Sequence, residues 1–184
     1  MDISRRQAVI DQLWPPGANA LPGVWAVLDL AHGPRIHAAL LESRLEHLCL
    51  YAGQLPRELE MVAPHLVELP RGHRLVDRLV DEGWGHSWGV FLKIDDPSNL
   101  RHHLRKFLKV QDQRGRSLLF RYYDPRVLRS FLPTCSAAEL REYFGPVRSF
   151  VAEGEDGDSV VEFSLAAGAL RCVARPLAVA IDQA

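Results

Sequence analysis

One pentapeptide of the sequence has the form of a nucleophile motif. Gly85-His-Ser-Trp-Gly89 matches the pattern Gly-x-Ser-x-Gly, in which α/β-hydrolases present a reactive serine on a sharp turn from a strand into a helix. Such a serine attacks an ester carbonyl when a histidine accepts its proton and an acidic residue orients that histidine. The pentapeptide therefore makes a small serine esterase, with Ser87 as nucleophile, one candidate function.

The elements predicted around Ser87 do not favour that chemistry. The motif needs a strand before the serine and a helix after it, whereas helical spacing at Leu75–Val80 precedes Ser87 and strand-like residues follow it. The last histidine of the chain is His103, so no histidine lies far downstream. Asp95 and His102 follow the serine in order, but Asp95 ends the next predicted strand, roughly 25 Å away at about 3.3 Å per residue. We therefore expect no catalytic activity and keep the esterase as an alternative.

The histidines and cysteines do not form a metal-binding pattern. His102 and His103 are adjacent, so on a helix they point to different faces and cannot chelate one ion as an i, i+4 pair can. Cys49, Cys135 and Cys172 are too few and too widely spaced for a disulfide framework or a zinc knuckle, and we expect reduced thiols. The glycine patterns that bind nucleotide phosphates are also missing from the sequence. We expect no metal and no cofactor.

Charge is unevenly distributed along the chain and gathers in one basic block. The net charge of the chain is −1, yet residues 101–129 hold nine Lys and Arg against two acidic residues. Arg101, Arg105 and Lys109 recur at helical spacing and are expected on the solvent side of one helix. Complementary charge guides encounters between proteins, so the block favours docking of an acidic protein partner. Phosphate contacts in a basic nucleic-acid-binding module are the alternative.

The stretch Leu118–Leu132 combines a predicted buried strand with a predicted short helix. Its first residues alternate as in a strand, and Asp124, followed by proline, has the chemistry of a helix N-cap. The turn between them brings Arg121, Asp124 and Arg126 close together. Two interpretations stay open. Asp124 caps the helix and pairs with Arg121, or Arg121, Tyr122, Asp124 and Arg126 contact a partner.

Trp84 and Trp88 lie on either side of the glycine-rich bend that contains Ser87. Aromatic side chains of this size are frequent anchors of protein interfaces when they are exposed. When they are buried, they supply a large part of a hydrophobic core. The sequence leaves both roles open for the two tryptophans.

These residues must be positioned by elements that the apolar pattern predicts. Strand and helix spacing alternate through the first two thirds of the chain, and the continuous apolar run Val24–Leu30 is typical of a strand covered on both faces. Ser136-Ala-Ala-Glu139 is a capping box that predicts the start of a later helix. The alternation predicts an α/β fold, with helices on a mixed, largely parallel sheet and a short C-terminal strand region. We expect a single domain over residues 1–184, with a core at 20–150 and a strand extension at 151–184.

Two segments of the sequence resemble a known family signature. Phe120-Arg-Tyr-Tyr-Asp-Pro-Arg-Val-Leu128, followed by Phe144-Gly-Pro-Val147, is similar to the signature of a type VI secretion family catalogued as domain of unknown function 4123. Weaker similarities follow the family's order at Trp25–Leu30, Ala63–Val67 and Trp88–Leu92. Members of that family are cytoplasmic adaptor chaperones, which hold a toxic effector and help to load it onto a VgrG-type spike. The resemblance implies this function for residues 20–150.

Taken together, the residues and the resemblance predict a non-catalytic adaptor. Its expected partners are a secreted effector and a VgrG-type spike protein, and neither nucleic acid nor a membrane is expected. The chain has no apolar run that would form a signal peptide or a transmembrane helix, so a cytoplasmic location is expected. The candidate partner-binding residues are Trp84, Trp88, Arg101, Arg105, Lys109, Arg121, Tyr122, Asp124 and Arg126.

Overall fold

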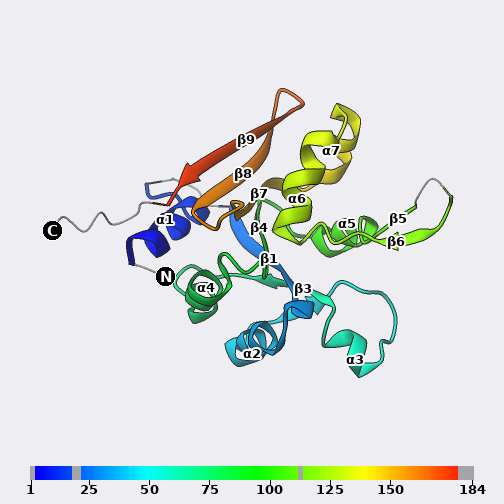
Figure 1. Cartoon of the computed structure of the whole chain (residues 1–184), viewed down its shortest axis with the longest axis horizontal. Helices are drawn as coiled ribbons and strands as arrows, with labels where there is room; N and C mark the ends of the chain where they lie inside the picture. Colours follow the sequence, from blue (N-terminus) through cyan, green and yellow to red (C-terminus); the bar gives the residue numbers. More distant parts are fainter. Residues whose placement is uncertain (1–2, 18–21, 112–113, 178–184) are drawn as a thin grey trace.

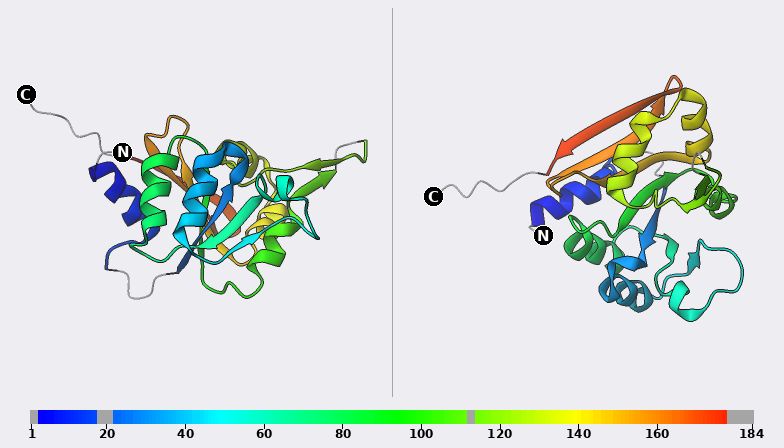
Figure 2. Two further views of the ribbon diagram at one scale, coloured as in Figure 1. Left: turned by 90° about the horizontal axis from the view of Figure 1, so that it is seen from below. Right: turned by 45° about the vertical axis from the view of Figure 1, so that its right-hand side comes forward.

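The fold is built on an antiparallel sheet with helices on both faces (Figures 1 and 2). The computed structural model describes residues 3–17, 22–111 and 114–177. The described residues form a seven-stranded sheet, whose strands from one edge to the other are β2 (His47–Cys49), β3 (Pro64–Glu68), β1 (Gly23–Asp29), β4 (Gly89–Ile94), β7 (Val147–Glu153), β8 (Ser159–Ala166) and β9 (Ala169–Pro176).

The helices divide between the two faces of this sheet. One face is covered by α1 (Ile3–Leu13), α2 (Pro34–Ser43) and α4 (Arg74–Arg78), which continues into the π-helical turn η2 (Leu79–Gly83). The other face is covered by α5 (Leu100–Lys106), α6 (Pro125–Phe131) and α7 (Ala137–Phe144). Shorter helical segments lie between these elements: η1 (Leu30–His32), α3 (Arg57–Glu60) and η3 (Leu132–Thr134). A separate hairpin of β5 (Lys109–Gln111) and β6 (Ser117–Leu119) extends away from the body (Figures 1 and 2).

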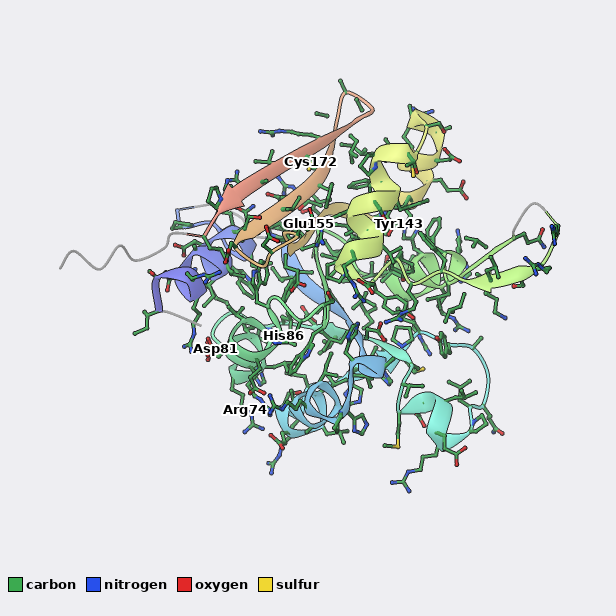
Figure 3. The ribbon with its side chains drawn as sticks, viewed as in Figure 1. Arg74, Asp81, His86, Tyr143, Glu155 and Cys172 are labelled. Carbon is green, nitrogen blue, oxygen red and sulfur yellow. The ribbon has the colours of Figure 1, made fainter. Side chains whose placement is uncertain are left out.

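Successive side chains of β1 point to opposite faces of the sheet and therefore belong to two separate hydrophobic cores. Val24, Ala26 and Leu28 pack with α1, α2 and α4, whereas Val27 packs beneath α5, α6 and α7. The second core is rich in aromatic rings, and Tyr143 of α7, labelled in Figure 3, contacts the rings of several neighbours. The prediction that the apolar run at residues 24–30 is covered on both faces is therefore confirmed.

The prediction of a largely parallel sheet was wrong, because every neighbouring pair of strands is antiparallel. Two helical connections, through α2 and through α4, join strands that run in the same direction, but each of them passes over one strand position. β3 lies between β1 and β2, and β1 lies between β3 and β4. Each intervening position is filled by a strand of opposite direction. Alternation of strand and helix patterns therefore indicated the crossovers but not the pairing.

The last strands are an integral part of the same sheet. β7 pairs with β4, although residues 95–146 separate the two strands in sequence. The predicted boundary at 150/151 falls inside β7, whose residues extend from Val147 to Glu153. The predicted C-terminal strand is present as β9, and residues 178–184 of that predicted region lie outside the described residues.

Candidate functional site

The loop that contains Ser87 is held by a buried carboxylate. Oε2 of Glu153 accepts a hydrogen bond from the Gly85 backbone at 2.6 Å, and Oε1 accepts from the Ser87 backbone at 3.0 Å. The Ser87 hydroxyl also donates to Oε1 at 3.2 Å. Ser87 has a left-handed backbone, with φ of 56°, and it follows η2 and precedes β4. The serine therefore lies after a helix and before a strand, which is the reverse of the order that a nucleophile turn requires.

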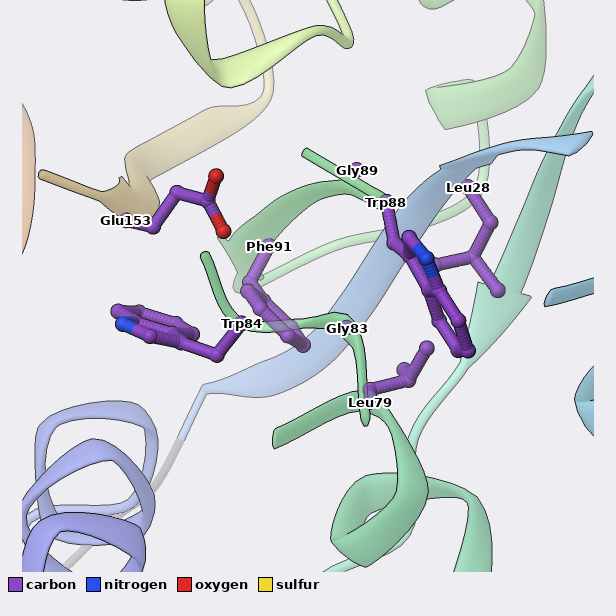
Figure 4. Close-up of a pocket in the computed structure, with 8 residues that line it drawn as sticks. All are labelled: Leu28, Leu79, Gly83, Trp84, Trp88, Gly89, Phe91 and Glu153. Atoms are coloured by element: carbon purple, nitrogen blue, oxygen red, sulfur yellow. The ribbon is translucent and has the colours of Figure 1, made fainter. Parts of the chain in front are cut away.

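The space beside this loop, whose lining residues are drawn in Figure 4, is too small for a substrate. The cavity has a volume of about 10 Å³, which is close to the minimum for one water molecule. Both tryptophans line it, and each is only 7 % exposed. Nε1 of Trp84 donates to the Gly157 carbonyl at 3.0 Å. Trp84 and Trp88 are thus core residues that pack the bend rather than surface anchors.

The turn before α6 is fixed by two aspartates and two arginines. Asp124 caps α6, because Oδ1 accepts from the Arg126 backbone at 3.0 Å and Oδ2 from Nη2 of the same arginine at 2.6 Å. The main partner of Arg121 is Asp29, whose side chain is 1 % exposed, with Nε and Oδ2 separated by 3.1 Å. Nη2 of Arg121 lies 4.0 Å from the Asp124 carboxylate. The cap was predicted correctly, but the role of Asp29 was missed. An acidic residue inside an apolar run was the available signal.

Replacing Asp124 with alanine should lower the melting temperature by about 1–8 °C, because the cap is worth about 0.5–2 kcal/mol and about 1 kcal/mol shifts a domain of this size by 2–4 °C. Burial by itself raises the pKa of the Asp124 carboxyl, but the hydrogen bonds from Arg126 outweigh burial and lower that pKa. The stabilisation is therefore present above the unfolded pKa of about 3.9 and is lost as the pH falls through the lower folded pKa. Thermal melts at about pH 7 and about pH 3 should show a smaller difference between the two proteins in acid. An unchanged melting temperature with lost partner binding would mean that Asp124 is a contact residue.

Tyr122 connects the turn to α5 from inside the core. Its side chain is fully buried, and its hydroxyl donates to the Leu104 carbonyl at 3.0 Å. Burial raises the pKa of that hydroxyl well above its ordinary value. Residues 120–124 form an irregular turn rather than the predicted buried strand, and Ser117–Leu119 lie in the exposed hairpin instead. Tyr122 has no exposed surface for a partner in this fold.

Arg101, Arg105 and Lys109 do come together along one hollowed surface. Arg101 and Arg105 lie on α5, whereas Lys109 begins β5 and is not helical as predicted. Nη2 of Arg101 donates to the Cys49 carbonyl at 3.0 Å, so this side chain reaches the edge strand β2. A hollow of about 380 Å³ next to α5 includes Arg101 and Arg105 among its lining residues.

A larger groove adjoins this hollow and shares Arg105 with it. We call it the α5 groove; its volume is about 650 Å³, and its lining residues are Leu50, Tyr51, Ala52, Leu55, Arg105, Lys106, Leu108, Lys109 and Leu119. The volume lies within the range of about 300–1,000 Å³ that is common for binding pockets. The apolar part of this surface was missed by the sequence analysis, because it combines two segments that are far apart in the chain.

The hairpin beside the groove exposes apolar side chains to an unusual degree. Val110, Leu118 and Leu119 are 41 %, 46 % and 51 % exposed, and all six strand residues of the hairpin are exposed. A two-stranded hairpin that stands apart from a core is marginally stable by itself in water. Large exposed apolar patches commonly mark surfaces that contact other molecules. The hairpin and the α5 groove are therefore the candidate functional site.

Other kinds of site are not assembled by the described part of the chain. Among residues 3–17, 22–111 and 114–177, no group of three or more His, Cys, Asp or Glu side chains is arranged to hold a metal ion. None of the described helices combines the length and the apolar character that crossing a membrane requires.

Comparison with known proteins identifies one family. A family model described as "Domain of unknown function (DUF4123)" matches residues 24–142, about two thirds of the chain. No curated protein and no solved structure shows a significant match. The matched region begins in β1 and ends in α7, so it includes α5, the hairpin and the turn at residues 120–126. The chain therefore belongs to the DUF4123 family.

Proposed function

We propose that this protein is a non-catalytic adaptor chaperone, which binds a secreted effector through the α5 groove and the basic residues that line it, Arg105, Lys106 and Lys109. The observation that carries the proposal is the combination of an open apolar groove with basic side chains at one place on the surface. Apolar surface supplies the driving force for association, and charge of one sign selects the partner and speeds the encounter. An adaptor needs such a surface, whereas an esterase needs a reactive serine with room for an ester.

The finer part of the proposal concerns the secretion system. The segments Phe120–Leu128 and Phe144–Val147 resemble the signature of type VI secretion adaptors. On this basis we propose that the protein acts in the cytoplasm, and that it helps to load the effector onto a VgrG-type spike. The neighbouring genes should then include a spike gene and a large toxin-like gene, whose product is the expected effector. Unrelated neighbours would contradict this part.

Reversing the charge of the groove should remove most of the effector binding. The double variant Arg105→Glu/Lys109→Glu is expected to bind the neighbouring toxin-like protein at least about tenfold more weakly in co-purification and titration, because two attractive contacts become repulsive. The fold should stay cooperative, since Lys109 is exposed and Arg105 is half-buried, and surface charges contribute little to stability. Added salt should weaken effector binding by the original protein and so reduce the difference in effector affinity between the original protein and the double variant.

A matched control and two contrary outcomes make this experiment decisive. The control Arg148→Glu/Arg171→Glu reverses two exposed arginines on β7 and β9, away from the groove, and should bind normally. Loss of DNA or RNA affinity in the groove variant, with protein binding unchanged, would favour the nucleic-acid alternative. Ester hydrolysis that disappears in Ser87→Ala would replace the proposal with the esterase alternative.

A further inference from the structure

We propose that the α5 groove binds an acidic amphipathic helix of the effector, rather than an extended strand or a folded domain surface. This inference rests on the function proposed above and specifies which chemical class of segment the groove takes. It follows from three properties of the groove: where its apolar residues come from, the sign of its charge, and the state of the nearby backbone.

The apolar lining comes from two separate parts of the chain. The segment after β2 supplies Leu50, Tyr51, Ala52 and Leu55, while the turn after α5 supplies Leu108 and the hairpin supplies Leu119. Figure 1 shows that the hairpin and the segment that carries α3 extend from the same side of the molecule. A groove lined by apolar side chains from two segments suits a helix that inserts a row of apolar residues at i, i+3, i+4 and i+7.

The charge of the lining selects an acidic partner. Arg105, Lys106 and Lys109 supply three of the nine lining residues, and none of the described residues that line the groove is acidic. In the adjoining hollow, Arg101 adds a further positive charge and the described lining again contains no acidic residue. A helix that carries Asp or Glu beside its apolar face therefore places acidic side chains against the basic side chains of the groove.

The backbone next to the groove offers little to an extended peptide. Strand addition depends on a row of unpaired N–H and C=O groups along a sheet edge. The edge strand β2 is only three residues long, and the Cys49 carbonyl at its end already accepts a hydrogen bond from Arg101. Each strand of the hairpin is also three residues long. Side chains rather than backbone groups therefore dominate the surface, which favours the helix.

The test uses overlapping peptides of about 20 residues from the toxin-like protein that the neighbouring gene encodes. As a helix each peptide spans about 30 Å, at about 1.5 Å per residue. Binding of each peptide to the protein is titrated by fluorescence anisotropy. Binding peptides should be acidic, with apolar residues at helical spacing. A covalent staple between positions i and i+4 on the solvent side should raise the affinity severalfold, because it reduces the ordering that binding requires. A peptide that binds as a strand should lose its affinity when stapled.

Two protein variants from different parts of the groove, with a matched control, locate the binding site. Leu119→Asp in the hairpin and Leu55→Asp in the segment after β2 should each weaken peptide binding about tenfold or more. Leu41→Asp changes a leucine of nearly equal exposure, 53 % against 51 % for Leu119, on α2 and outside the groove, and it should leave binding unchanged.

The outcomes separate this inference from the function on which it rests. If the intact effector does not bind the original protein, the adaptor proposal fails, and this inference fails with it. If the effector binds but no peptide does, or if the binding peptides are basic or are weakened by stapling, only the helix inference is overturned. Full affinity of both groove variants for the peptide would also overturn it.

Discussion

Replacing Gly89 with alanine should destabilise the protein by more than about 4 kcal/mol, enough to lower its melting temperature by about 8–16 °C or to prevent folding. A Cβ atom at this position would lie 2.2 Å from the Val27 carbonyl oxygen and 3.0 Å from the Leu28 Cα. Both atoms belong to the backbone of β1, the strand between β3 and β4, so neither can move without disturbing the sheet. Thermal unfolding followed by circular dichroism measures the effect.

A second glycine of the same strand pair provides the control. At Gly23, in β1, the nearest atom to an added Cβ is the Trp25 Nε1 at 3.4 Å, which is an ordinary contact. Gly23→Ala should therefore change the melting temperature by no more than about 2 °C, in keeping with a substitution that creates no clash. Equal melting temperatures for the two alanine variants would show that β1 and β4 are not packed as closely as described.

Removing the carboxylate of Glu153 should produce the second large effect. In Glu153→Ala the Gly85 backbone, the Ser87 backbone and the Ser87 hydroxyl lose their acceptor together. Each buried donor left unsatisfied costs about 1–3 kcal/mol, and water can reach some of them, so we expect a total loss of about 3–5 kcal/mol. The melting temperature should then fall by roughly 6–20 °C.

Two milder variants separate the contributions at this loop. Ser87→Ala removes one of the three hydrogen bonds and should cost only about 0.5–1.5 kcal/mol. Glu153→Gln keeps one acceptor oxygen, so its loss of unfolding free energy should lie between those of Ser87→Ala and Glu153→Ala. Urea unfolding gives the three free energies. A Ser87→Ala variant as unstable as Glu153→Ala would mean that the hydroxyl, rather than the carboxylate, holds the loop.

The sequence predicted features that depend on neighbouring residues. The cap at Asp124 and the capping box of Ser136 and Glu139 are both present, because each is a hydrogen-bonding pattern within three residues of the chain. The ion pair between Asp29 and Arg121 was not predicted, because its partners are 92 residues apart. Strand order was beyond the same reasoning, since apolar patterns show which faces are buried but not which strands are neighbours.

The candidate site, too, was predicted only where its residues lie close together in the sequence. The basic side chains of Arg101 and Arg105 were recognised because helical spacing places them on one face of α5. The α5 groove was not recognised, because Leu55 and Leu119 lie in distant segments that only the folded chain brings to one surface. Leu118 and Leu119 were predicted to be buried by their strand-like alternation. Among the described residues their strand pairs only with β5, so the pattern indicated a strand without showing how it is covered.

The pairing of β4 with β7 has a consequence for the nascent chain on the ribosome. Roughly 50 residues separate the two strands, so at about 5–20 residues per second β7 is synthesised some 3–10 s after β4. During that interval one edge of β4 has unpaired backbone groups beside Val90, Leu92 and Ile94, and such an edge readily pairs with other chains. Translation of the residues between Ile94 and Val147 is therefore the period of greatest aggregation risk. Slower elongation there should lower the yield of folded protein more than slower elongation after Glu153.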